Sequence, residues 1–169
     1  MKRLILVRHA EKDFTCEDRR DNPLSKHGVK QAKDIAKFLE KYPYEIVFTS
    51  LMRRAIQTAE IINEGKEKKI VKSISFNEYY VRDDQENMET TNMGVSRTLT
   101  KIYSVADIYD SILIVGHNSI NKTILQRLLN MGYDEAQECF SSYGETVVLR
   151  YDWEKGDDKW IIEDHYTPQ

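Results

Sequence analysis

The chain has 169 residues and a formal net charge of −3, and 40% of its residues are hydrophobic and 31% charged. This composition predicts a single globular domain over residues 1–169, long enough to bury a core. The negative balance argues against nucleic acid as a partner, and no apolar run approaches the roughly 20 residues of a membrane helix. Cys16 and Cys139 lack metal-type spacing and are expected to be free thiols, which favours a cytoplasmic location, as does the lack of a signal-peptide pattern.

In chain order, the first half of the sequence predicts two strand–helix pairs followed by an edge strand. The predicted strands are residues 4–7, 45–49 and 70–76. Ser25 is expected to cap the first helix, which has apolar residues at helical spacing and ends at Pro43. Thr49 or Ser50 is expected to cap the second helix, which closes near Gly65.

The second half of the sequence continues this alternation after a polar, acidic stretch at residues 83–92, which predicts a surface loop. The later elements are a helix over 94–109, a central strand over 112–115, a helix capped by Ser119, and strands over 146–151 and 160–163 joined by a turn at Gly156 and Asp157. Strands that alternate with helices predict an α/β fold of three layers. We expect a mostly parallel central sheet with helices on both faces.

Two of the predicted strands end on a histidine. Residues 4–7 lead into Arg8 and His9, and residues 112–115 lead through Gly116 into His117. Ligands bind at strand ends in open α/β sheets, so the two imidazoles are expected to meet at one site. Arginine binds phosphate oxygens bidentately, and a neutral imidazole is a nucleophile near pH 7. The combination predicts a site for a phosphoryl group.

Two further segments supply groups that phosphoryl transfer needs. Arg53 and Arg54 lie at the start of the second predicted helix, where backbone N–H groups favour an anion. Neighbouring helical residues point about 100° apart, so only one of the two arginines is expected to face the site. Glu78 follows a strand-like run, and a carboxyl group there is a candidate general acid.

Together these segments resemble the histidine phosphatase superfamily, also called the phosphoglycerate mutase-like family, over residues 4 to about 151. Arg8-His9 corresponds to the family's Arg-His-Gly signature, and Leu24-Ser25-Lys26-His27-Gly28 to its Leu-Thr/Ser-x-x-Gly element. Residues 50–59 match Ser-x-x-x-Arg-Ala-x-x-Thr-Ala, an alignment that selects Arg54. Asn77-Glu78 matches the acid segment, and the second histidine corresponds to His117.

The resemblance implies a mechanism for hydrolysis of phosphomonoesters. His9 attacks phosphorus and becomes phosphohistidine, while Arg8, Arg54 and His117 hold the phosphoryl oxygens. Glu78 protonates the leaving group and then helps to deprotonate water. The resemblance implies no metal and no cofactor, because arginine and histidine supply the positive charge. The implied partner is a small phosphorylated metabolite or a phosphoprotein.

This sequence departs from the family pattern at several positions. Ala10 replaces the signature glycine, which an alanine tolerates unless the backbone needs a positive φ. Asn118 follows the second histidine where glycine is usual, and is expected either to add a phosphate contact or to narrow the pocket. Thr15 stands where many members have an asparagine that contacts phosphate. The stretch after Glu78 lacks the Gly-rich, Trp-containing segment of many members.

Several alternatives stay open at this point. A phosphohistidine-protein phosphatase needs less help from an acid at Glu78. A phosphoglycerate-type mutase has this core and, in addition, long insertions that cover the site and exclude water. The segment between Glu78 and Ile112 is too short for such insertions, which favours hydrolysis. A non-catalytic phospholigand-binding module would lack a working nucleophile, whereas His9 is present. A His/Glu metal hydrolase is disfavoured because the sequence has no His-x-x-x-His pair.

Overall fold

The computed structural model describes residues 1–18, 21–78, 91–154 and 160–169. Within those ranges one sheet has the strand order β3-β2-β4-β1-β5-β6. The strands are β1 (Arg3–Arg8), β2 (Ile46–Thr49), β3 (Lys69–Lys72), β4 (Ser111–Gly116), β5 (Thr146–Tyr151) and β6 (Trp160–Tyr166). The four strands β1 to β4 pair in parallel, and β5 and β6 are added antiparallel at one side. The predicted mostly parallel sheet is therefore confirmed.

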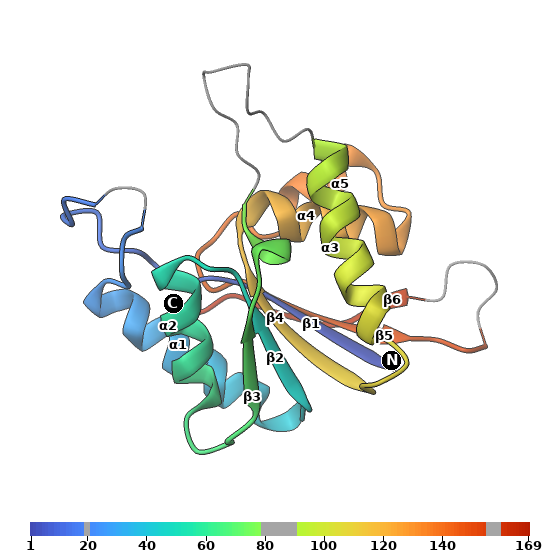
Figure 1. Cartoon of the computed structure of the whole chain (residues 1–169), viewed down its shortest axis with the longest axis horizontal. Helices are drawn as coiled ribbons and strands as arrows, with labels where there is room; N and C mark the ends of the chain where they lie inside the picture. Colours follow the sequence, from blue (N-terminus) through green and yellow to red (C-terminus); the bar gives the residue numbers. More distant parts are fainter. Residues whose placement is uncertain (19–20, 79–90, 155–159) are drawn as a thin grey trace.

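Helices cover both faces of the sheet (Figure 1). The helices are α1 (Lys26–Phe38), α2 (Arg53–Asn63), α3 (Thr91–Val105), α4 (Asn118–Leu129) and α5 (Tyr133–Glu138), with short 3-10 turns η1 (Leu39–Lys41) and η2 (Ile74–Phe76). The pair α1 and α2 lies on one face, and α3, α4 and α5 lie on the other (Figure 1). None of the helices in the described ranges is long and apolar enough to cross a membrane.

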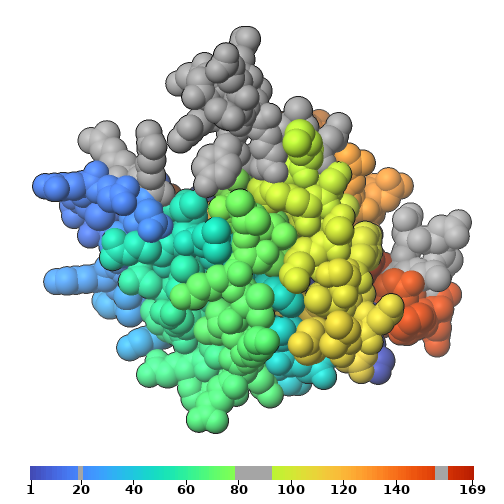
Figure 2. Space-filling model, in the orientation of Figure 1, coloured from blue at the N-terminus to red at the C-terminus, as the bar shows by residue number. Residues whose placement is uncertain are grey.

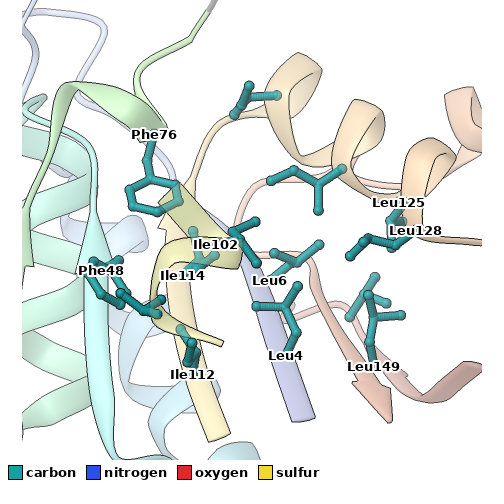
Figure 3. Packing of buried hydrophobic residues seen from close by; sticks show 14 of the residues in the cluster. Leu4, Leu6, Phe48, Phe76, Ile102, Ile112, Ile114, Leu125, Leu128 and Leu149 are labelled. Carbon is teal, nitrogen blue, oxygen red and sulfur yellow. The ribbon is translucent and has the colours of Figure 1, made fainter. Parts of the chain in front are cut away.

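The alternation of side chains along β1 divides the core into two layers. Leu4 and Leu6 belong to the buried cluster beneath α3 and α4 (Figure 3), and Ile5 and Val7 belong to the cluster beneath α1 and α2. Because successive strand residues point to opposite faces, an all-aliphatic strand must be covered on both sides. The run Leu4–Val7 thus determines both the central position of β1 and the three-layer arrangement.

The start of each long helix shows which predicted caps were right. Ser25 caps α1 as predicted, because its Oγ accepts a hydrogen bond from the N–H of Gly28 at 2.9 Å. The predicted caps of the other two helices were wrong. Met52 is the N-cap of α2 and His117 that of α4, and neither side chain accepts a capping bond. Ser119 lies inside the first turn of α4, where its N–H binds the Glu78 carboxylate.

Two predicted boundaries also differ from the structure. The edge strand ends at Lys72 rather than at residue 76, because η2 follows it and packs beside α3 (Figure 2). Arg97 of α3 donates to the carbonyls of Ile74 and Ser75 at 2.9 and 2.6 Å. The predicted helix over 94–109 spans Thr91–Val105. Most of the loop expected at 83–92, and the turn at Gly156 and Asp157, lie outside the described residues.

Candidate active site

The sheet register brings the two strand-end histidines together. Arg8 of β1 pairs with Gly116 of β4, so His9 and His117 each come one residue after the same pair. The N–H of His9 donates to the carbonyl of Gly116 at 2.9 Å. The centroids of the two imidazole rings are 5.1 Å apart, with the planes inclined at 67°. The carboxyl edge of the parallel strands therefore carries a pair of adjacent imidazoles.

His9 is held as a neutral imidazole with one defined tautomer. The side chain is only 5% exposed, and its Nδ1 lies 2.8 Å from the carbonyl oxygen of Ala10. A carbonyl oxygen can only accept, so Nδ1 carries the proton and Nε2 carries the lone pair. Arg54 Nε donates to this Nε2 at 3.1 Å. Burial, reinforced by the charge of Arg54, lowers the pKa of His9 to about 3.

His117 is the more deeply placed partner. Its side chain is buried, and its Nε2 lies 2.8 Å from Oγ of the buried Ser50. Burial is the main cause that lowers the pKa of His117 well below its usual value, and the neighbouring His9 and Arg54 add to it. The hydrogen bond between this nitrogen and Ser50, which follows β2, fixes the orientation of the ring.

The structure separates the two arginines at the start of α2. Arg54 is half-buried and contacts His9, whereas Arg53 is exposed and its backbone N–H binds Asp21. Thr58, one turn along the helix, accepts a bond from the N–H of Ala10 at 3.1 Å and donates to the carbonyl of Arg54 at 2.7 Å. Thr58 thus connects the residue after His9 to the helix that carries Arg54.

Arg8 leaves β1 on the side facing β5. One terminal nitrogen donates to the carbonyls of Phe140 and Ser141 at 2.9 and 2.6 Å. The guanidinium carbon lies 4.2 Å from the ring centroid of Tyr143, which is itself 5.6 Å from the ring of His9. Arg8 Nε is buried and has no hydrogen-bond partner among the described residues. A buried cationic donor without an acceptor is suited to an anionic ligand.

Glu78 lies at the N-terminus of α4, next to His117. Its carboxylate accepts hydrogen bonds from the N–H groups of Ser119 at 3.0 Å and Ile120 at 3.1 Å. Asn77 fixes the same segment, since its Oδ1 accepts from the N–H of Leu51 at 2.9 Å and its carbonyl accepts from Arg97 at 2.8 Å. The chain between η2 and residue 78 is therefore anchored both to the segment that joins β2 to α2 and to α3.

The departures from the family pattern have separate structural outcomes. Ala10 is fully buried and is not among the non-glycine residues with a positive φ, so alanine fits there without strain. The Thr15 hydroxyl donates to Asp13 at 2.7 Å, so it does not replace the phosphate contact of the asparagine that many members have at this position. Asn118 is the first residue of α4, and its buried Oδ1 has no partner in the described part of the chain.

Sequence reasoning missed several residues that shape this site. Ser50 and Thr58 were visible as motif positions, but their contacts with His117 and Ala10 depend on the folded register. Lys12 is a further cation near the site: burial, with the charges of Arg54 and Arg8, lowers its pKa. Tyr143 and Glu145 lie before β5 and belong to no motif, so no sequence signal marked them.

Comparison with known proteins assigns the chain to a family. The sequence model of the histidine phosphatase superfamily (branch 1) matches residues 4–94, which is more than half of the chain. The chain therefore belongs to this superfamily. It is a histidine-type phosphatase, an enzyme class that hydrolyses phosphomonoesters without a metal.

Individual relatives cover almost the whole chain. The uncharacterized phosphatase PhoE of Bacillus subtilis is 28% identical, over 98% of this chain and 94% of that protein. The solved structure of Bacillus stearothermophilus YhfR has a TM-score of 0.79 at 20% identity and covers 96% of both chains. A mycobacterial glucosyl-3-phosphoglycerate phosphatase, solved in complex with VO3, has a TM-score of 0.78 at 16% identity and covers 100% of both. The two structural similarities support the phosphoglycerate mutase-like fold.

Proposed function

We propose that this protein hydrolyses a phosphomonoester through a phosphohistidine intermediate on Nε2 of His9. The observation that carries the proposal is the state of that ring. His9 is buried, its Nδ1 lies 2.8 Å from the carbonyl oxygen of Ala10, and its ring centroid lies 5.1 Å from that of a second histidine. A neutral, oriented imidazole has the nucleophile's lone pair available without first losing a proton.

Substrate binding frees that lone pair. Arg54 Nε donates to His9 Nε2 in the structure. When a phosphoryl group enters, Arg54 exchanges this bond for one to a phosphoryl oxygen, which is the stronger acceptor because it is charged. Arg8 and His117 bind the other oxygens, and Asn118 adds a polar contact at the start of α4. These donors stabilise the charge that the phosphoryl group carries in the transition state.

The reaction then has two steps. Nε2 of His9 forms a bond to phosphorus while the bond to the leaving oxygen breaks, and Glu78 gives that oxygen a proton. Water next attacks the phosphohistidine, Glu78 takes up the water proton, and the P–N bond breaks to release inorganic phosphate. The position of Glu78 at the N-terminus of α4, beside His117, supports this role.

The substrate is proposed to be a small phosphorylated metabolite. The two histidines are only 5% and 2% exposed, so the reacting group has to enter a recessed site. Hydrolysis rather than phosphoryl transfer between metabolites is supported by the relatives, which are named as phosphatases.

The test is a phosphatase screen over a metabolite panel, with a phosphohistidine protein included. Wild type is compared with His9→Ala and His27→Ala. The second variant is the control, because His27 is a half-exposed histidine that pairs with Glu11 and, among the described residues, does not contact His9 or His117. Turnover is expected for at least one metabolite in wild type and His27→Ala, and is expected to vanish in His9→Ala. Activity on the phosphoprotein alone would replace the proposed substrate class, and full activity in His9→Ala would refute the mechanism.

A further inference from the structure

The loop before β5 determines where Arg8 points. The carbonyls of Phe140 and Ser141 each accept a hydrogen bond from the guanidinium group, and the ring of Tyr143 stacks against it, with its centroid 4.2 Å from the guanidinium carbon. These contacts occupy one side of Arg8, while its buried Nε has no acceptor among the described residues. The direction of the free donor thus depends on the shape of residues 140–143.

This loop has a conformation that needs support. Phe140 has φ of +56°, in the left-handed region that costs a non-glycine residue of order 1 kcal/mol or more. Its side chain is fully buried, so the backbone cannot relax without moving the core. Local interactions must therefore hold the carbonyls toward Arg8.

Glu145 supplies these interactions from the opposite side of the loop. Its Oε1 accepts from the N–H of Phe140 at 2.6 Å, and its Oε2 accepts from the N–H of Ser142 at 3.1 Å. The peptide unit between Ser141 and Ser142 thus binds Arg8 through its carbonyl and Glu145 through its N–H. A trans peptide points these two groups in opposite directions, so fixing the N–H also fixes the carbonyl.

The carboxylate is itself firmly held. Glu145 is 2% exposed, and its Oε1 has a further contact at 2.9 Å with Nε2 of His165 on β6. Its own backbone carbonyl accepts from the N–H of Arg8 at 2.9 Å. A buried carboxylate is costly unless its oxygens are bonded, and here both oxygens accept hydrogen bonds from the loop while one also contacts β6.

We propose that Glu145 is a positioning residue for Arg8: through the Ser141–Ser142 peptide it keeps the guanidinium group aimed at the phosphoryl group. This inference rests on the proposed function, in which Arg8 binds a phosphoryl oxygen. Glu145 touches no reacting atom. Removing its charge leaves the catalytic groups in place but lets the loop carbonyls and the arginine turn away.

The experiment is a double-mutant cycle on kcat/KM for p-nitrophenyl phosphate, using wild type, Glu145→Gln, Arg8→Ala and the double variant. Glu145→Gln sets an amide N–H against a loop N–H, and we expect kcat/KM to fall about tenfold, together with a similar loss of vanadate affinity. In the Arg8→Ala background the same substitution is expected to change kcat/KM by less than about twofold, because coupled residues are not additive. The control is Glu163→Gln on β6, whose carboxylate pairs with Arg3, and it should leave kcat/KM unchanged.

The outcomes separate the two proposals. Wild-type kcat/KM in Arg8→Ala would overturn the role of Arg8 in the proposed function, and this inference with it. Suppose instead that Arg8→Ala lowers kcat/KM strongly. If Glu145→Gln then has no effect on kcat/KM, or lowers it by the same factor in the wild-type and Arg8→Ala backgrounds, this inference alone is overturned. If Glu145→Gln gives no cooperative thermal transition, His165→Ala takes its place in the cycle. Since His165 is half-exposed, that variant should fold, and a smaller loss that disappears in Arg8→Ala is expected.

Discussion

At the residue scale, two imidazoles are kept neutral by burial while an arginine lies against one of them. Burial disfavours the charged form of His9 and His117, and Arg54 strengthens this effect on both. The same arginine places its positive charge beside His9, where we propose that the phosphoryl group binds. In the proposed mechanism, this pair of neighbours provides both the nucleophile and an anion-binding group.

The first prediction concerns the two adjacent arginines. Arg54→Ala should lower kcat/KM on the order of a hundredfold, because it removes a charged donor from the transition state. Arg53→Ala is the matched control, since the side chain of Arg53 is exposed and its hydrogen bond to Asp21 is made by the backbone N–H. Steady-state kinetics with p-nitrophenyl phosphate measure both. A larger loss in Arg53→Ala would show that the residues were assigned in the wrong order.

The second prediction concerns Glu78. Glu78→Gln should lower the rate with alkyl phosphates by about 10² or more, and much less with aryl phosphates, whose leaving groups need no proton. Glu78 also binds the first N–H groups of α4, so the substitution is expected to destabilise the protein as well. That effect lowers the rate with all substrates by the same factor. The dependence of kcat on leaving-group pKa separates the two effects. Equal losses for alkyl and aryl esters would remove Glu78 from the acid role and leave it as a helix cap.

The sequence was most informative for residues at the ends of strands. His9 and His117 follow aliphatic strands, and the helical angle between Arg53 and Arg54 already required that only one face the site. Tyr143 and Glu145 could not be found in this way. Their contacts with Arg8 arise because β5 pairs antiparallel with β1, and no local pattern in residues 140–145 reports that pairing.

At the element scale, the site depends on how closely α1 approaches the segment after His9. Gly28 lies in the first turn of α1, and a Cβ added there would collide with the backbone carbonyl oxygen of Glu11. Ser25, the cap of α1, bonds both the carbonyl oxygen and the carboxylate of Glu11. The start of α1 therefore packs directly against Glu11, in the loop that follows His9 (the His9 loop).

The third prediction follows from that contact. Gly28→Ala should lower the free energy of unfolding by about 1–3 kcal/mol, as overpacking does, and should also reduce activity by moving the His9 loop. Gly132→Ala is the control, because no atom lies within 4 Å of a Cβ built there and its φ is −62°. Urea denaturation of both variants measures the difference. Equal stability of the two variants would contradict the described packing of α1.

Elements with a strong local pattern were predictable, and those defined by tertiary contacts were not. The cap at Ser25 and the strands at residues 4–7 and 112–115 carry their own signals. The six-residue helix α5 is too short for a clear amphipathic period and was missed. Ser119 was expected to cap α4, but the distant Glu78 binds its first turn, which sequence spacing cannot show.

At the scale of the whole molecule, burial of neutral histidines links stability to pH. The unfolded chain binds protons at His9 and His117 below about pH 6.5, whereas the folded chain does not until far lower pH, so stability falls as pH decreases. The free energy of unfolding should decrease between pH 7 and 5 with a slope approaching about 1.4 kcal/mol per pH unit for each histidine.

Urea denaturation at several pH values measures that slope. His117→Gln should flatten the pH dependence, whereas His27→Gln, at a half-exposed position, should leave it as in wild type. The comparison is made above pH 5, where carboxylates with depressed pKa values such as Asp13 and Asp164 stay ionised. A slope that is the same in wild type and His117→Gln would show that this imidazole is not buried in its neutral form.

The most direct measurement is to trap and locate the phosphoryl group during turnover. Wild-type protein is mixed rapidly with p-nitrophenyl phosphate, quenched in base, digested, and examined by mass spectrometry. The mechanism predicts a base-stable, acid-labile phosphoryl group on the peptide containing His9, and none on that peptide in His9→Ala. A phosphoryl group on a different residue, or normal turnover of His9→Ala, would contradict covalent catalysis by His9.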